Sequence, residues 1–140
     1  MDHDLILFSI GRIAEQANRF LMAELRRRGM GELGVSHMEI VGVLTRRDKI
    51  QMKELVELIG KDKSTITALV KKLLRLKLIT RSPDPGDSRV SHISLTEKGR
   101  KLESTVNEIS KRLREKAYRG LSERDKEEMM RLLEMIRRNF

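Results

Sequence analysis

The sequence predicts a mainly helical α+β protein whose small β component is one hairpin. Three observations support this prediction. Apolar residues recur every three or four positions over most of the 140-residue chain, which is the spacing of helix faces. Both prolines, Pro83 and Pro85, fall in the short stretch SPDPGDSR. Runs of β-branched residues flank that stretch on both sides, as the strands of a hairpin do.

The first expected helix covers about residues 5–28 and ends at the Gly29-Met30-Gly31 segment, because glycines stop a helix. Its apolar stripe is Ile6, Ile10, Ile13, Ala17, Phe20 or Leu21, and Met22 or Leu25. Next, Ser36 and Glu39 have the spacing of a capping box, in which each side chain accepts a hydrogen bond from the other residue's backbone N–H. A short helix is expected from there to about Thr45.

A helix-turn-helix pattern follows. Residues 51–59 are expected to form a short helix that ends at Gly60, a residue suited to the left-handed conformation of a helix end. Asp62 then caps a longer helix that runs to about Leu76. Two helices joined by a short glycine-containing turn form a helix-turn-helix, although ordinary helical hairpins have a similar pattern. The apolar face of the longer helix is Ile66, Leu69, Val70, Leu73 and Leu74.

The period of the pattern changes after this helix. Residues 78–82 and 90–95 are expected to form the two strands of the hairpin, with Ile93 and Leu95 on a half-buried face. The prolines and the glycine between them exclude helix and favour a tight loop. A hairpin that directly follows a helix-turn-helix is a wing, so the lobe over about residues 36–95 is expected to be a winged helix-turn-helix.

Two further helices close the chain over about residues 97–140. Thr96 is expected to cap a long helix that runs to about Arg119 and stops at Gly120. Ser122 and Asp125 have the spacing that starts the last helix. With no repeat, linker or low-complexity tract between them, residues 1–140 are expected to form a single domain.

The net charge of +9 is concentrated in the middle of the chain. Residues 46–101 contain 15 Lys and Arg against 7 Asp and Glu, whereas the remaining residues contain 15 against 14. A basic excess on one segment predicts a polyanionic partner, and nucleic acid before a membrane surface. The alternative is a solvated, Lys- and Glu-rich surface of the kind that thermophilic proteins carry.

The composition excludes several other functions. The chain has no cysteine, so it offers no disulfide, thiolate metal site or cysteine redox sensor. An acidic start and the lack of an 18-residue apolar run argue against a signal peptide and a membrane span, so a soluble, cytoplasmic protein is expected. No phosphate-binding glycine motif, GxSxG motif or cysteine nucleophile is present, and an enzyme is not expected. His3, His37 and His92 lack metal-ligand spacing, so neither a metal nor another cofactor is expected.

Several motifs together resemble one known family over essentially the whole chain. The segments DKSTITALVKKLLRLKLITR, DPGDSR and LTEKG, and the later GLSERDKEEM, are similar to the MarR (multiple antibiotic resistance regulator) family of prokaryotic transcription factors. The most specific part is Asp87-x-Arg89 leading into residues 95–99. Lys77 departs from the family pattern, because glycine often precedes the Leu-Ile of the wing; a lysine is tolerable there because it faces the negative end of the helix dipole.

The resemblance implies a nucleoid-associated homodimer that binds a pseudo-palindromic operator, most often as a repressor. The dimerisation helices are then those over about residues 5–28 and 97–140. Many members of the family also bind a small aromatic or acidic effector between the dimer helices and the DNA-binding lobe, but the sequence does not identify the residues of such a site. The apolar residues expected at the dimer interface are Leu5, Ile6, Phe8, Leu102, Val106, Ile109, Leu113, Leu132, Leu133, Ile136 and Phe140.

The polar face of the longer helix of the helix-turn-helix is the expected reader of bases. Short hydroxyl side chains suit hydrogen bonds with base edges or phosphates, alanine packs against a thymine methyl, and basic side chains reach phosphates. The expected DNA-binding residues on this helix are Lys63, Ser64, Thr65, Ala68, Lys71, Lys72 and Arg75. The alternative is an exposed helix face that is polar and basic without a partner.

The wing is expected to act through Arg89. The resemblance implies that this arginine lies in the DNA minor groove, where narrow A·T tracts concentrate negative potential. Asp87 can accept two hydrogen bonds from the guanidinium and hold it extended, while Pro85 and Gly86 restrict the loop. The alternative is a surface hairpin with an incidental ion pair. For the whole chain, the alternative to a regulator is an architectural DNA-binding protein of the same fold that has no effector.

Overall fold

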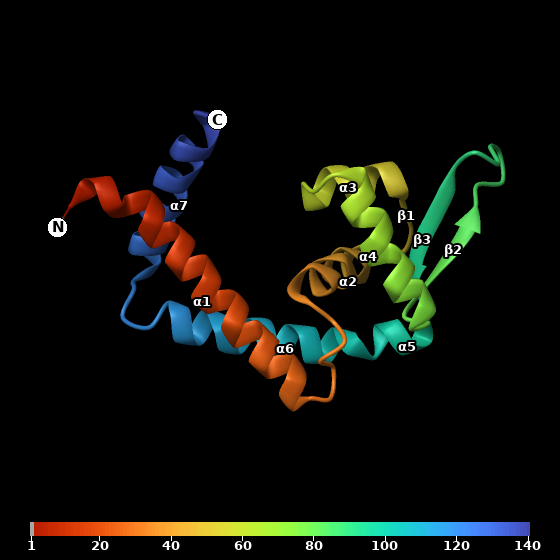
Figure 1. Ribbon diagram of the computed structural model, residues 1–140, viewed down its shortest axis with the longest axis horizontal. Helices are drawn as coiled ribbons and strands as arrows, with labels where there is room; N and C mark the ends of the chain where they lie inside the picture. The colour runs from red at the N-terminus through yellow and green to blue at the C-terminus, as the bar shows by residue number, and fades with distance from the viewer. Residues whose placement is uncertain (1) are drawn as a thin grey trace.

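The chain folds into a lobe and an arm (Figure 1). The structure is a computed structural model that describes residues 2–140. The lobe contains α2 (Val35–Arg46), β1 (Ile50–Gln51), α3 (Met52–Ile59), α4 (Lys63–Arg75), β2 (Ile79–Pro83) and β3 (Ser91–Leu95). The arm contains a 3-10 turn (His3–Leu5), α1 (Ile6–Arg27), α6 (Leu102–Ala117) and α7 (Glu123–Arg138), and the short α5 (Glu97–Arg100) joins it to the lobe. The predicted fold class, mainly helical with a small antiparallel sheet, is confirmed.

The sheet has three antiparallel strands in the order β1-β3-β2. The predicted hairpin is present: β2 and β3 pair from Ile79 opposite Leu95 to Pro83 opposite Ser91. The third strand, β1, was not predicted, because two residues are too few for a period to be read. Its Ile50 lies opposite Ile93, and both side chains are buried.

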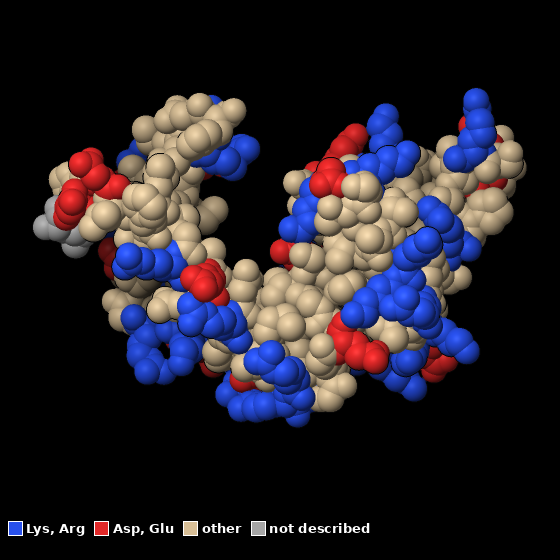
Figure 2. Space-filling view, in the orientation of Figure 1, with Lys and Arg blue, Asp and Glu red and all other residues tan. Residues whose placement is uncertain are grey.

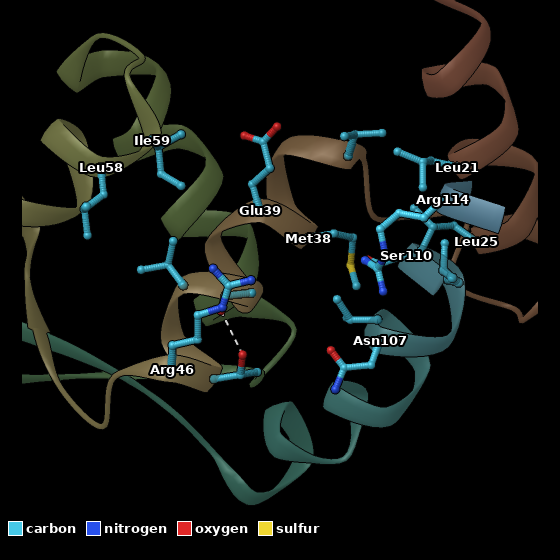
Figure 3. A pocket seen from close by; sticks show the side chains of 16 residues that line it. Leu21, Leu25, Met38, Glu39, Arg46, Leu58, Ile59, Asn107, Ser110 and Arg114 are labelled. Carbon is cyan, nitrogen blue, oxygen red and sulfur yellow. Dashed lines mark hydrogen bonds between the residues drawn. The ribbon is translucent and has the colours of Figure 1, made fainter. Parts of the chain in front are cut away.

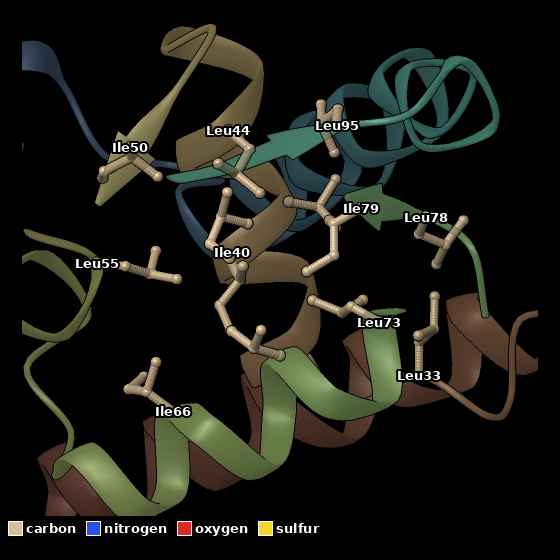
Figure 4. Packing of buried hydrophobic residues seen from close by; sticks show 13 residues of the cluster. Leu33, Ile40, Leu44, Ile50, Leu55, Ile66, Leu73, Leu78, Ile79 and Leu95 are labelled. Atoms are coloured by element: carbon tan, nitrogen blue, oxygen red, sulfur yellow. The ribbon is translucent and has the colours of Figure 1, made fainter. Parts of the chain in front are cut away.

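One apolar core holds the lobe together (Figure 4). Each of α2, α3, α4 and the three strands contributes at least one buried side chain to it. Because the buried face of α4 is fixed against this core, its polar face points to solvent. The core residues are Leu33, Ile40, Val41, Leu44, Ile50, Leu55, Ile66, Val70, Leu73, Leu78, Ile79, Ile93 and Leu95.

The predicted capping box of Ser36 and Glu39 is wrong. The helix begins at Val35, so Ser36 already lies in its first turn and the N-cap is Gly34. The side chain that reaches back is His37, whose Nδ1 accepts a hydrogen bond from the Gly34 N–H at 2.9 Å. Burial, and then the nearby charge of Lys72, lower the pKa of His37, which favours the neutral imidazole that this cap requires.

The long helix expected after Thr96 is divided in two at Lys101. The two pieces pack against different parts of the molecule, because α5 contacts β3 whereas α6 contacts α1 and α2. The predicted cap at Thr96 is present, since its Oγ1 accepts from the Gly99 N–H at 3.0 Å. The interruption at Lys101 therefore lies where the chain passes from the lobe to the arm.

Part of the expected dimer seam on α6 is covered within the protomer. Leu102 and Val106 pack against the core of the lobe, and Ile109 is buried. These three side chains lie where the arm rests on the lobe, and only Leu113, which is half-buried, lies further out on α6. The α6 seam therefore contributes less exposed apolar surface than expected.

A buried carboxylate, not singled out from the sequence, ties α1 to α6. Glu24 accepts from Arg27 at 3.2 Å, lies 3.3 Å from Arg112 and also pairs with Arg28, which in turn bonds Glu108 at 3.0 Å. The hydrogen bond from Arg28, with the charges of Arg112 and Arg27, lowers the pKa of Glu24. The carboxylate stays ionised and compensated, as a buried charge requires.

Lys77 is the one non-glycine residue with positive φ among residues 2–140, at +60°. It follows the C-cap of α4, where the Lys77 N–H bonds Leu74 O and the Leu78 N–H bonds Leu73 O, both at 3.0 Å. This is the Schellman ending, which favours glycine because Cβ crowds the backbone in the left-handed region. Lys77 therefore carries a conformational cost beside its favourable position at the negative end of the helix dipole.

We expect Lys77→Gly to stabilise the protein by about 1 kcal/mol, because it removes the cost of a side chain in the left-handed region. Urea unfolding at matched protein concentration measures the change, since association would otherwise alter the apparent stability. Lys77→Ala is the control, because it removes the charge and keeps Cβ. A glycine variant no more stable than the alanine variant would contradict this account.

Candidate nucleic-acid interface

The first turn of α4 is organised by the predicted cap, Asp62. Its Oδ1 accepts from the Thr65 N–H at 2.8 Å and from the Ser64 hydroxyl at 2.6 Å, and its Oδ2 accepts from the Thr65 hydroxyl at 2.9 Å. These hydrogen bonds, the one from Ser64 foremost, lower the pKa of Asp62 to about 2. In this conformation both hydroxyl protons point at Asp62, so Ser64 and Thr65 present acceptor lone pairs outward. Such groups suit base-edge amino groups.

Most of the expected DNA-binding residues of α4 share one exposed face. Those that are exposed are Lys63, Ser64, Thr65, Ala68, Lys71 and Arg75. Lys72 differs, because it is half-buried and its Nζ donates to the carbonyl oxygen of Glu32. Thr67, not singled out from the sequence, is also exposed, and its hydroxyl donates to Lys63 O at 2.8 Å. Helical periodicity alone could have found Thr67, since it lies one turn after Lys63.

The wing tip carries the ion pair expected from the sequence. The Asp87 carboxylate accepts from Nε and Nη2 of Arg89, each at 3.0 Å, and its Oδ1 also accepts from the Arg89 N–H at 3.0 Å. The guanidinium side chain is nevertheless 88% exposed, so it is oriented without being covered. The hydrogen bond from Arg89 lowers the pKa of Asp87 and keeps the carboxylate charged.

A basic groove runs between α3, the start of α4 and the wing. Its volume is about 520 Å³, and its charged lining is Lys53, Lys63, Arg81 and Arg89 against the single acid Glu57. The Arg81 Nε donates to the Ser91 hydroxyl at 3.1 Å, which holds this side chain along the strand. Figure 2 shows Lys and Arg side chains over this side of the lobe and at the tip of the hairpin. A groove with this excess of cations suits a phosphate backbone.

A second cavity, of about 540 Å³, lies between the lobe and the arm. Figure 3 shows Leu58 and Ile59 of α3 on one side and Leu21, Leu25 and Arg114 of the arm on the other. Apolar residues make up much of its lining, to which Arg46 and Arg114 add two cationic groups and Glu39 adds one carboxylate. The sequence did not predict its residues, because they come from four helices that are distant along the chain.

Two further features are absent from residues 2–140. No group of three or more His, Cys, Asp or Glu side chains in that range is arranged to hold a metal ion. None of the helices in that range is long and apolar enough to cross a membrane.

The helix-turn-helix, the hairpin beside it and the basic groove between them define a winged helix-turn-helix protein. A family model described as "MarR family" matches residues 32–90. The transcriptional repressor IacR of Pseudomonas putida is 25% identical over 109 residues, which are 78% of this chain and 65% of IacR. The chain therefore spans about two thirds of the length of this relative.

Two solved structures share the fold. The S. aureus MepR–DNA complex superimposes with a TM-score of 0.88 and 21% identity, covering 96% of this chain and 98% of that chain. Bordetella bronchiseptica BpsR, whose DNA binding is regulated by 6-hydroxynicotinic acid, gives a TM-score of 0.82 and 18% identity over 94% of this chain and 91% of that chain. The match to the MarR family model over residues 32–90 and the shared winged-helix fold confirm the resemblance noted in the sequence.

The Asp87–Arg89 pair predicts whether removal of Asp87 strengthens or weakens DNA binding. Removal of an acid beside DNA strengthens binding if only bulk charge matters, because repulsion of the phosphates falls. Since Asp87 orients Arg89, we expect Asp87→Ala to weaken operator binding although it makes the protein more basic. Arg89→Ala should weaken binding by roughly 1–3 kcal/mol, the scale of one specific contact.

Titration of labelled operator DNA with folded protein at fixed salt measures both effects. Arg89→Lys is the matched control and should recover part of the loss, because an ammonium keeps the charge but not the planar fork. Tighter binding by Asp87→Ala would mean that the tip is only a basic loop.

Proposed function

We propose that this protein is a sequence-specific DNA-binding transcriptional regulator that acts as a homodimer on a pseudo-palindromic operator. The observation that carries the proposal is the exposed face of α4 beside an exposed, oriented arginine at the wing tip, with a basic groove between them. This arrangement suits a helix in the major groove and a wing arginine in the neighbouring minor groove. The similarity to the repressor IacR supports repression as the mode of regulation. A role on DNA supports the cytoplasm, and within it the nucleoid, as the place where the protein acts.

The arm supports the homodimer. No residue of α7 is buried within the protomer, although the helix spans 16 residues. Most helices in proteins are stabilised by packing of an apolar face, so α7 needs a partner surface. Exposed apolar side chains gather on α7 and at the start of α1, and several of them were expected at the interface. The exposed apolar side chains of these two regions are Leu5, Ile6, Leu7, Phe8, Ile13, Met129, Met130, Leu132, Met135 and Phe140.

The cavity between lobe and arm supports response to an effector. Its apolar lining suits an aromatic compound, and Arg46 and Arg114 suit an acidic group on that compound. BpsR, a structure of the same fold, is regulated by a heteroaromatic carboxylic acid. We therefore propose a small aromatic acid as the effector class and a change in operator affinity as its result.

We expect Leu132→Asp to prevent dimerisation, because it places a charge in the apolar face that α7 presents. The same variant should lose helix content, since α7 then lacks a packing partner. Analytical ultracentrifugation and circular dichroism at micromolar concentration measure the two effects, with Leu132→Met as the apolar control. A well-folded wild-type monomer at that concentration would contradict the homodimer.

Competition binding tests the regulatory function. We expect the protein to prefer DNA from the promoter region of its own gene over random DNA by about three orders of magnitude or more. Ala68→Glu should remove most of this preference, because it places a carboxylate against base edges. Lys71→Ala should weaken binding to both DNAs and reduce the salt slope by about one unit.

A preference ratio near unity for the wild type would favour the architectural alternative, in which the protein binds DNA without reading its sequence. Unchanged operator affinity of Ala68→Glu would exclude α4 from the groove. Because Ala68 is exposed, the variant should fold normally, and its melting curve checks this.

A further inference from the structure

The loop between β2 and β3 is organised by one side chain that has no place in the interface described above. Asp84 Oδ2 accepts from the backbone N–H of Gly86 at 2.8 Å and of Asp87 at 3.1 Å. Its Oδ1 lies 2.7 Å from Nε2 of His92. Both carboxylate oxygens are therefore used, and the hydrogen bonds, that from His92 foremost, lower the pKa of Asp84.

His92 connects this turn to the sheet. It lies in β3, opposite Gln51 of β1 and Ser82 of β2, and its side chain is only 15% exposed. The imidazole therefore has a fixed position, and Asp84 is held between a rigid strand and the loop. The backbone closes the same turn, since the Asp84 N–H donates to Val90 O at 2.9 Å.

A continuous series of hydrogen bonds leads from β3 to the wing tip. His92 bonds Asp84, Asp84 accepts from the backbone N–H of Asp87, and Asp87 holds the guanidinium of Arg89. The Val90 N–H also donates to Asp87 O at 3.0 Å, which fixes the backbone on the other side of Arg89. The orientation of Asp87 thus depends on the turn that Asp84 forms.

We propose that Asp84 and His92 are positioning residues for DNA binding, which fix the wing tip so that Asp87 presents Arg89 to the minor groove. The proposal rests on the proposed function, DNA binding by the wing. Asp84 adds a negative charge near DNA, so its presence has an electrostatic cost for binding. An ordered loop offsets that cost, because less conformational freedom is lost when Arg89 docks.

A double-mutant cycle on operator affinity separates positioning from general stability. We expect Asp84→Ala to lower affinity roughly tenfold in the wild-type background, as coupled neighbours do, and to have little effect in an Arg89→Ala background. A purely structural role would lower affinity equally in both backgrounds. An equal loss, or tighter binding by Asp84→Ala, would overturn the proposal.

Conservative variants test whether the hydrogen bonds of Asp84 and His92 account for the change in affinity. Asp84→Asn keeps an oxygen that accepts from Gly86 and Asp87 and should retain part of the affinity. His92→Gln keeps a donor toward Asp84 and should bind more tightly than His92→Leu, which has none. Asp48→Ala is the charge control, since it removes an exposed acid of the same lobe outside the wing and should not weaken binding.

Hydrogen exchange in the free dimer gives a readout that does not depend on DNA. Asp84→Ala and His92→Leu should speed exchange of the Gly86 and Asp87 amides and of the Arg89 Nε proton, measured by NMR, while the core amides of β3 stay protected. Unchanged exchange at Arg89 would overturn the proposal. Faster exchange at Arg89 in a protein that shows no operator preference would support the positioning and overturn the proposed function.

Discussion

The arrangement of α4, the wing and the arm depends on the contacts that the carbonyl oxygen of Leu78 makes with the start of α5. This oxygen accepts from the Thr96 N–H at 3.0 Å, and a Cβ on Gly99 would lie 2.0 Å from it. Only glycine permits this approach of α5 to the residue that ends the α4 turn and starts the hairpin. Thr96 Oγ1 adds a hydrogen bond to Lys77 O at 2.7 Å, and Lys98 Nζ adds one to Leu76 O at 3.0 Å.

These contacts give the segment LTEKG a physical meaning. Leu95 belongs to the core of the lobe, Thr96 caps α5 and bonds the residue after α4, and Gly99 allows the close approach. The segment therefore holds the end of α4, the start of the hairpin and the start of the arm against one another. In the proposed regulation, the effector contacts cavity walls that belong to both the lobe and the arm.

The sequence predicted the features that depend on local chemistry. The Asp62 cap, the Gly60 helix end, the hairpin and the Asp87–Arg89 pair each involve residues within a few positions of one another. The sequence did not predict the features that depend on tertiary packing. The α2 cap depends on a half-buried His37, β1 is visible only through its pairing with β3, and α6 uses its apolar seam against its own lobe. The cavity between lobe and arm and the Asp84–His92 contact arise only after the chain has folded.

Hydroxyl-radical footprinting of both strands of the operator tests the central claim, that α4 and the wing read adjacent grooves of one half-site, most directly. The account predicts two protected half-sites with centres roughly 10–10.5 base pairs apart, or a multiple of that, related by two-fold symmetry. Each should have a flanking minor-groove protection that disappears in Arg89→Ala while the central protection remains. Uniform protection without symmetry, or flanking protection that persists without the arginine, would contradict it.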